Sequence, residues 1–416
     1  MLLYTKRVMS KSTLIVVFFA LLLMAVATNQ VSAHATLENT TPAQNSVVSH
    51  PQQIELHYNE PVNTKYSSIT IFDDKGKSLG EFKPTNSGTN QTLTFDVGQL
   101  DNGTHKVSWH TTSADGHEIQ DEFEFSINKK TTSNIDVTPP FYETSNFWFG
   151  LFRFITEGSL IVLMGSFLVN SVAKRYQLPT YLAFFSYKPI SWILSAMAFI
   201  TAIIYIMTLS PELVSNIMAL NMTALLQAPF LLAMIAIIVL LLLFTLNEMM
   251  TIWYIAISLI IIVTLSMSGH VWAQSFPLWS IILRSIHLLG MALWLGGMVY
   301  LVWLATTKQL QDIVKVKRFF FKLNLGAVIA LVISGVLMAI DETSLAAIWS
   351  SVTTWSSLFY VKIIGTILMI TLGSYQSFRA LTNLQKVNKK VLYCEIIIGI
   401  MLVLAGIIMS QIQIPS

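Results

Sequence analysis

The chain has 416 residues, of which 54% are hydrophobic and 11% charged, against about 25% charged in ordinary soluble domains. Its net charge of +3, without a basic tract, argues against a nucleic-acid-binding protein. The single cysteine, Cys394, rules out an intrachain disulfide framework and a cysteine-cluster metal site.

The chain begins with the pattern of a secretory signal peptide, predicted to cover residues 1–33. A basic start precedes an apolar run over residues 13–27, and Val31-Ser32-Ala33 supplies a small-residue cleavage site. Cleavage there makes His34 the first residue of the mature protein. A terminal histidine offers its α-amine and a ring nitrogen to one cation, and such nitrogen donors in a roughly square arrangement suit Cu(II).

Residues 34–130 are polar and are predicted to form an exported antiparallel β-sandwich. In the clearest strand Phe123, Phe125 and Ile127 share one face, and acidic residues occupy the other. Turn sequences such as Asp73-Asp74-Lys75-Gly76 separate the segments. About 100 residues are enough for one sandwich core. The alternating segments are 54–58, 66–72, 92–97, 107–110 and 123–127.

A short loop between two of these strands carries Asp115 and His117. Gly116 between them allows a tight backbone, so both side chains can converge on one point. With His34 they form a nitrogen-rich set with one oxygen donor, which fits Cu(II) well and Ca(II) or Mg(II) poorly. The exported region contains no methionine or cysteine, so we expect no dedicated Cu(I) site there. The alternative is an Asp-Gly turn beside a surface histidine.

After a linker at 131–146, residues 147–416 consist of long apolar runs and predict an all-α polytopic membrane domain. Residues 212–226 are too short and polar to span and are expected at the interface. Basic residues gather in alternate loops, so the sandwich and the C-terminus are predicted to lie outside the plasma membrane. About eight transmembrane helices are expected, at 148–172, 187–209, 228–247, 251–268, 281–306, 319–340, 354–377 and 391–411.

Ionisable residues inside the predicted spans are functional candidates by default. Arg153 and Glu157 lie four residues apart and can pair on one helix face. His287 and Met291 begin a face that continues to Trp294 and Met298. With His270, His287 and Met291 are candidate copper contacts at the outer side, because imidazole and thioether groups are copper donors.

Two alternatives for these membrane residues stay open. The methionine face fits ordinary helix packing, and Arg284, on the same span as His287, fits a side chain that reaches the lipid headgroups. Lys362 falls in the outer half of the seventh predicted span.

Together these motifs resemble a CopC domain fused to a CopD domain, as in YcnJ-like copper import proteins. The resemblance implies a cupredoxin-like sandwich that binds Cu(II) through His34, Asp115 and His117, and a polytopic membrane domain associated with copper uptake. The CopC-like parts are His34-Ala35, Pro42-Ala43, Tyr58-Asn59-Glu60-Pro61-Val62 and Ser113-Ala114-Asp115-Gly116-His117. The CopD-like part is centred on the run from His287 to Gly297.

The function expected from the sequence is copper acquisition by a protein that is not an enzyme. Its expected partners are the copper ion, the lipid bilayer and, as candidates, an extracytoplasmic copper chaperone or reductant. One alternative is copper tolerance by sequestration or export. Another is a membrane oxidoreductase with haem held by His270 and His287.

Overall fold

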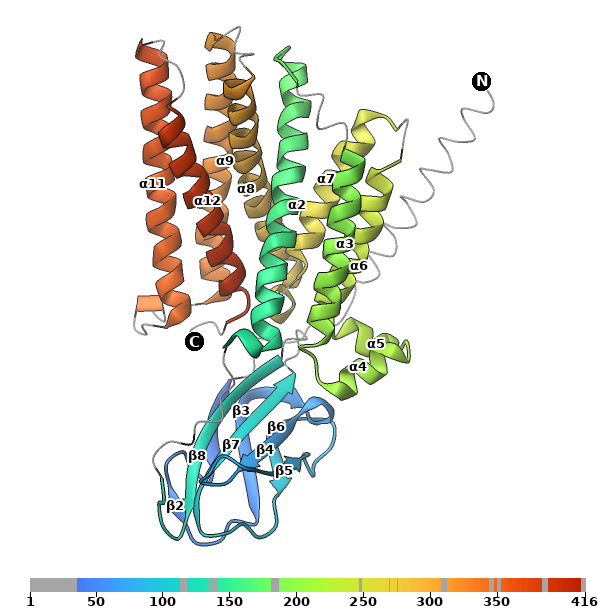
Figure 1. The fold of residues 1–416 in the computed structure, drawn as a ribbon, viewed down its shortest axis with the longest axis vertical. Coiled ribbons are helices and arrows are strands. Elements are labelled where there is room, and N and C mark those ends of the chain that lie inside the picture. Colours follow the sequence, from blue (N-terminus) through green and yellow to red (C-terminus); the bar gives the residue numbers. More distant parts are fainter. Residues whose placement is uncertain are drawn as a thin grey trace, which may run out of the picture.

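A β-sandwich sits on one end of a bundle of long helices (Figure 1). The computed structural model describes residues 36–112, 118–132, 135, 141–180, 187–246, 249–268, 270–274, 276–307, 313–343, 348–349, 353–383 and 388–412. The predicted signal peptide lies outside these residues. The expected fold class, a sandwich followed by a helical membrane domain, is confirmed.

The sandwich consists of two sheets, with strand orders β1-β3-β6 and β2-β8-β7-β4-β5. Paired neighbours run antiparallel, except that β2 and β8 are parallel. The strands are β1 (Leu37–Thr41), β2 (Val47–Val48), β3 (Gln53–Asn63), β4 (Ser68–Phe72), β5 (Ser78–Phe82), β6 (Thr89–Asp96), β7 (Gly103–Thr112) and β8 (Glu118–Ile127).

The sandwich core follows from the alternation seen in the sequence. Along β3, Ile54, Leu56 and Tyr58 are buried, while Glu55 and His57 face outward. The five alternating segments fall in β3, β4, β6, β7 and β8. The other three strands are short, and few of their residues enter the core. Periodicity therefore did not reveal them.

The first part of the predicted linker packs onto the sandwich. Ile135 is buried, and both of its backbone polar groups are held by side chains. Its N–H donates to Glu124 Oε1 at 2.8 Å, and its carbonyl accepts from Lys106 Nζ at 2.5 Å. Lys106 also pairs with Glu122 at 2.6 Å. The chain is thus fixed to the sheet before it reaches the membrane domain.

Six helices in the described part of the chain are long and apolar enough to cross a membrane, and two apolar helices are shorter. The long ones are α2 (Ser145–Arg175), α3 (Tyr187–Ile206), α8 (Pro277–Thr306), α9 (Ile313–Glu342), α11 (Thr354–Asn383) and α12 (Lys389–Met409). The shorter ones are α6 (Pro229–Phe244) and α7 (Thr251–Ser266). The 3-10 turns η1 (Thr64–Tyr66), η2 (Phe141–Glu143) and η4 (His270–Ala273) and the short helices α4 (Pro211–Met218) and α5 (Met222–Leu226) complete the elements used below.

The eight expected spans therefore become six helices of full spanning length and two shorter ones in the expected places. At 1.5 Å per residue, α6 and α7 reach about 24 Å, less than the roughly 30 Å hydrocarbon core of a bilayer. Pro229 begins α6, and the carbonyl of Leu242 accepts from the hydroxyl of Thr245, where α6 ends. Apolar length in the sequence overestimated these two helices because their ends are set by such local polar contacts.

The closest packing in the bundle is between α2 and α8. A Cβ added to Gly165 would lie 1.8 Å from the carbonyl oxygen of Ala292, and one added to Gly296 would lie 2.2 Å from the carbonyl carbon of Gly165. The two backbones are thus in direct contact, which only residues without a side chain permit. On its other side α8 meets α9 at Gly290 and Gly297.

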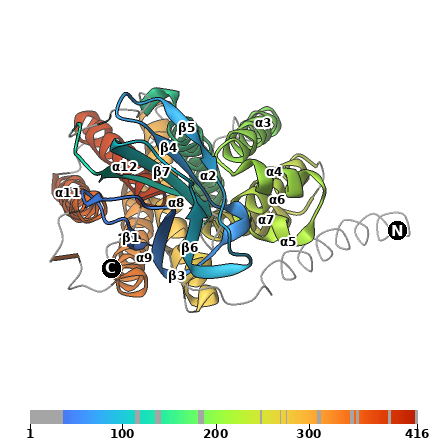
Figure 2. The same ribbon diagram turned by 90° about the horizontal axis from the view of Figure 1, so that it is seen from below.

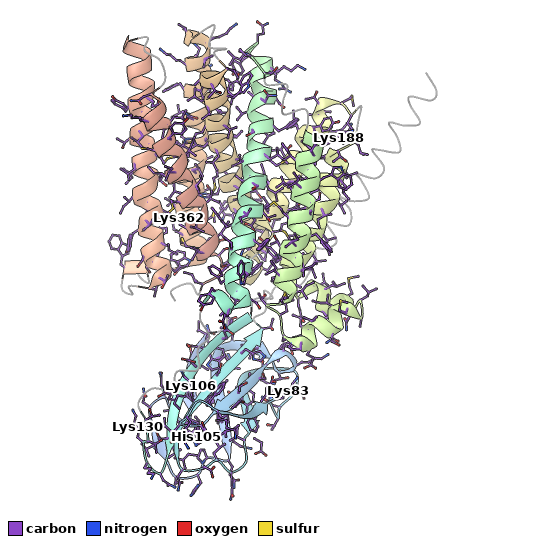
Figure 3. The ribbon with its side chains drawn as sticks, viewed as in Figure 1. Lys83, His105, Lys106, Lys130, Lys188 and Lys362 are labelled. Carbon is purple, nitrogen blue, oxygen red and sulfur yellow. The ribbon has the colours of Figure 1, made fainter. Side chains whose placement is uncertain are left out.

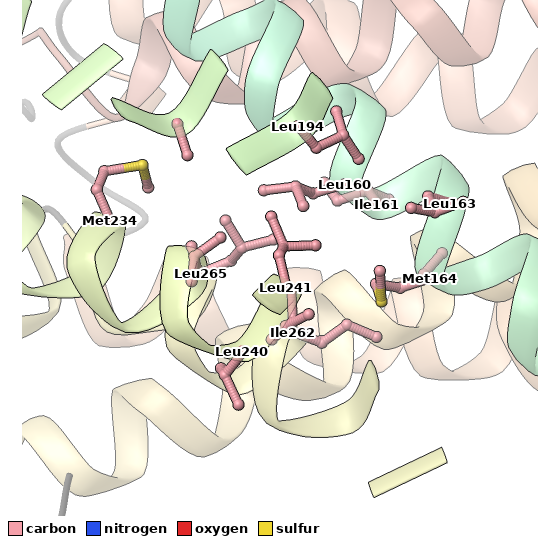
Figure 4. Close-up of a cluster of buried hydrophobic side chains, with 14 of the residues drawn as sticks. Leu160, Ile161, Leu163, Met164, Leu194, Met234, Leu240, Leu241, Ile262 and Leu265 are labelled. Carbon is pink, nitrogen blue, oxygen red and sulfur yellow. The ribbon is translucent and has the colours of Figure 1, made fainter. Parts of the chain in front are cut away.

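Helix α2 separates two groups of helices. Seen from below, α3, α6 and α7 lie on one side of α2, and α11 and α12 on the other (Figure 2). A continuous apolar core joins α2 to α3, α6 and α7 (Figure 4). It contains Leu160, Ile161, Met164, Leu194, Met234, Leu241, Ile262 and Leu265. Helix α2 begins at the sandwich end of the bundle and runs into this core.

We predict that Gly165→Ala destabilises the full-length protein by about 1–3 kcal/mol or more, because the new methyl group meets backbone atoms of α8. The measurement is the melting temperature of the detergent-purified protein. Gly326→Ala in α9 is the matched control, since its Cβ would meet nothing within 4 Å. There a helical alanine should stabilise by roughly 0.5–1 kcal/mol. Equal effects of the two changes would contradict the close crossing.

Candidate functional site

The three predicted Cu(II) ligands, His34, Asp115 and His117, lie outside the described residues. The structure describes the chain that flanks them. Thr36 is joined to β3 by two hydrogen bonds: its N–H donates to Asn59 Oδ1 at 2.7 Å, and its carbonyl accepts from Asn59 N at 3.0 Å. This bonding holds the chain two residues after His34 against β3.

The loop that carries Asp115 and His117 joins the ends of β7 and β8. Thr112 and Glu118 are paired across these two strands. The ring of Trp109, in β7, meets the ring of Tyr58, in β3, edge to face at 5.6 Å. Since Tyr58 precedes Asn59, the flank of His34 and the flank of the loop lie toward the same end of the sandwich.

Two buried polar atoms lie at this end of the core. Among the described residues, neither Tyr58 Oη nor Trp109 Nε1 has a hydrogen-bond partner. Burial raises the pKa of the Tyr58 hydroxyl, which therefore stays protonated. Tyr58 was predicted only as part of a motif, and no role was predicted for Trp109. The two rings meet through a contact between the two sheets, which strand periodicity does not predict.

The same end of the sandwich touches the membrane domain. Thr111, near the end of β7, is hydrogen-bonded to Ser67 at 2.7 Å, directly after η1. Tyr66, the last residue of η1, is buried in the apolar core of the helix bundle. Burial, and secondly Glu212 of α4, raise the pKa of the Tyr66 hydroxyl. No pattern in the sequence predicted that Tyr66 makes an interdomain contact.

Two polar contacts with α4 support this docking. Lys83 Nζ and Glu212 Oε2 are 2.9 Å apart, and Lys65 Nζ donates to Asn216 Oδ1 at 3.4 Å. Residues 212–226, expected at an interface, form α4 and α5 and lie beside the sandwich at the end of the bundle (Figure 1). Leu213 of α4 is buried in the bundle core. Helix α4 therefore joins the two domains.

His110 lies on the other face of β7 from Trp109. It is half-buried against β4. Its ring nitrogens lie 3.2 Å from Ser68 Oγ, which donates to Glu81 at 2.6 Å. Burial lowers the pKa of His110; Glu81 acts in the opposite sense and Lys83 adds to the lowering.

In the membrane domain, His287 faces α9. Its Nδ1 lies 3.0 Å from Ser334 Oγ, and a Cβ added to Gly335 would lie 3.4 Å from its Cε1. Met291, one turn further along α8, packs against the apolar core of the bundle. His287 lies about ten residues, or about 15 Å, into α8, because the helix starts at Pro277 rather than near 281.

Charged side chains gather at the sandwich end of the bundle, and those that act on His287 are Lys362 and Arg284. Arg153 Nε and Glu157 Oε1 form the expected pair at 2.7 Å, and both residues are buried. Arg284 Nη1 donates to the carbonyl of Ser268, just after α7, at 2.5 Å. Lys362, on α11, lies in the sandwich-side half of the bundle (Figure 3).

Among the side chains that the structure describes, no group of three or more His, Cys, Asp or Glu residues is close enough to hold a metal ion. His287 and Met291 supply two donors on one helix. His270 begins η4, ahead of α8, and its side chain lies outside the described part. The described membrane residues therefore offer a nitrogen and a thioether rather than a complete metal cage.

Comparison with known proteins identifies the sandwich. Residues 37–128 match the family described as CopC domain. Protein YobA of Escherichia coli K12 is 32% identical over 111 residues, which are 26% of this chain and 90% of YobA. Copper resistance protein C of Pseudomonas syringae pv. tomato is 31% identical over 102 residues, 23% of this chain and 81% of that protein.

Two further matches cover a similar share of this chain. Copper transport protein CutJ of Bacillus subtilis 168 is 30% identical over 100 residues, which are 23% of this chain and 18% of that protein. The crystal structure of CopC from Methylosinus trichosporium OB3b has 27% identity and a TM-score of 0.22, covering 24% of this chain and all of that one.

We predict that the sandwich loses stability as the pH falls below about 6.5, the pKa of a histidine in an unfolded chain. The folded state, in which the pKa of His110 is lowered, then binds fewer protons than the unfolded state, and stability rises with pH across that window. His110→Gln should remove this part of the pH dependence. The exposed His50 provides the control His50→Gln.

The measurement is urea unfolding of residues 34–130, which contain Trp109 as their single tryptophan. Its fluorescence reports the sandwich core directly. An unchanged pH profile in His110→Gln would contradict this assignment.

Proposed function

The chain belongs to the CopC family through residues 37–128, and we propose that it acquires copper at the outer face of the plasma membrane. The sandwich captures Cu(II) through His34, Asp115 and His117 and passes copper to an entrance near His287 for import. Copper is cargo here, and no residue of the chain performs a covalent step. Relatives named for copper resistance and copper transport support the copper assignment.

The observation that supports transfer of copper between the domains is an interdomain contact. The end of the sandwich that flanks the predicted ligands is the end that contacts the helix bundle. Tyr66 enters the bundle core, and Thr111 is bonded to the residue after it. A metal site at this end of the sandwich would face the bundle rather than open solvent. A docked donor replaces diffusion between two proteins with a transfer inside one chain, which raises the effective concentration.

The proposed ligand set has defined chemical requirements. The terminal amine and the two imidazoles bind only when deprotonated, so protons compete with copper. Asp115 supplies one negative charge, which partly balances the divalent cation. At the bundle, Ser334 orients the ring of His287 through a hydrogen bond to Nδ1. This contact leaves Nε2 as the nitrogen that can bind copper.

We predict that one alanine inserted between Ala33 and His34 lowers Cu(II) affinity at least about tenfold, equal to about 1.4 kcal/mol. The insertion moves the amine away from the imidazole while keeping every side chain. The measurement is competitive Cu(II) titration with electron paramagnetic resonance, after mass spectrometry of the mature terminus. Unchanged affinity and spectra would show that the terminal histidine is not a ligand.

Cellular copper content under copper limitation tests the direction of transport. We predict lower copper in a deletion strain, with His34→Ala and His287→Ala close to the deletion level and His50→Ala close to wild type. Inductively coupled plasma mass spectrometry measures the content. Higher copper in the deletion strain would make this a tolerance protein. Equal copper in all strains would contradict a role in copper handling.

A further inference from the structure

The membrane domain contains a second buried acid, Glu395, far from the sandwich. It lies on α12, about 9 Å from the start of the helix, and only 6% of its surface is exposed. That start is at the end of the bundle away from the sandwich (Figure 1). The copper proposal above does not use it.

The described partner of Glu395 is neutral. Gln376 Nε2, on α11, donates to Glu395 Oε2 at 3.3 Å. A Cβ on Gly373 would lie 3.7 Å from Oε1, so a glycine leaves room beside the carboxyl group. Among the described side chains, no lysine or arginine is within ion-pair distance of Glu395. Glu157 differs, since it is paired with Arg153 at 2.7 Å.

Helix α12 packs against α11, α2 and α8. Gly158 of α2 lies beside Val403, and Gly399 lies beside Leu295 of α8. These neighbours show which residues of α2 and α8 lie at the same depth in the bundle as Glu395. At this level, residues 162–170 of α2 include no charged residue.

At this depth α8 and α11 have three ionisable residues, namely Tyr300, Tyr375 and Arg379. Tyr300 of α8 is directed to Pro179, whose carbonyl accepts from its hydroxyl. Tyr375 and Arg379 follow Gly373 on α11, and the side chain of Arg379 lies outside the described part.

A carboxylate without a cation beside it is costly inside a bilayer. The acid avoids this cost by keeping its proton, and it does so because of its burial, since the hydrogen bond donated by Gln376 favours the carboxylate. The same site becomes favourable for the carboxylate as soon as a cation arrives. An acid with a neutral partner can therefore exchange a proton for a cation, whereas the Arg153–Glu157 pair is already neutralised.

We propose that Glu395 and Gln376 form a proton-exchange site in the half of the membrane domain remote from the sandwich. Glu395 holds one proton at rest. When a cation binds, the O–H bond breaks, the proton leaves and the carboxylate takes the cation; no electron is transferred. The identity of that cation as copper rests on the proposed function, whereas the proton-holding acid does not.

The first test is infrared spectroscopy of the full-length protein in lipid nanodiscs over a pH series. The carbonyl stretch of a protonated carboxylic acid should lose the intensity of one group in Glu395→Gln and keep it in Glu395→Asp. Glu157→Gln is the matched control and should leave the band unchanged. Gln376→Leu should keep the band and move it to higher frequency, because the donated hydrogen bond is lost. Equal bands in wild type and Glu395→Gln would overturn the proposal.

The second test measures copper uptake and proton release together in proteoliposomes. Wild type should release protons as copper enters, and Glu395→Gln should release at least about tenfold fewer protons per copper. Wild-type uptake without proton release would overturn the exchange and leave the proposed function intact. Absence of wild-type uptake would reject the import proposal, and the infrared band would still decide whether Glu395 holds a proton.

Discussion

The backbone contact between α2 and α8 is the constraint on which the arrangement of the helix bundle depends. Helix α2 begins at Ser145, at the sandwich end of the bundle, and α8 carries His287 and Arg284. Because Gly165 and Gly296 let the two backbones touch, the depth of His287 is fixed relative to the start of α2. A larger residue at either glycine would shift α8 as a unit, since packed helices move as rigid elements. The position of the membrane donors relative to α2 is therefore set by this crossing, and that of the sandwich by the contacts of Tyr66 and α4.

The polar and apolar contacts between the two domains contribute unequally to the stability of the interface. The exposed pair between Lys83 and Glu212 contributes at most about 1 kcal/mol, as surface ion pairs do. Burial of an aromatic ring such as that of Tyr66 in the bundle core contributes about 1.5–3 kcal/mol. Orientation thus comes from the polar contacts of α4, and most of the stabilisation comes from Tyr66.

The sequence predicted most of the fold, because periodicity and apolar length are local properties. Strand alternation located β3 and β8, and the spacing of Arg153 and Glu157 predicted their pair. The features that it missed depend on contacts between distant segments. Tyr66 looks like an ordinary strand residue until α4 is placed beside it, and the hydrogen bond of Arg284 is made to Ser268, which lies beyond its own helix. The burial of Glu395 likewise depends on the helices packed against α12. The predicted ligands His34, Asp115 and His117 stay a prediction.

The two ends of the proposed route differ in the donors they offer. The sandwich set combines nitrogen donors with one carboxylate and lacks sulfur, which suits Cu(II). The described membrane donors are the imidazole of His287 and the thioether of Met291, a softer pair that suits Cu(I). The charged groups that act on His287 are Lys362 and Arg284, and both are positive. A divalent ion would add two uncompensated charges in a low-dielectric region, and a monovalent ion would add one. On electrostatic grounds the described membrane donors therefore favour Cu(I) over Cu(II).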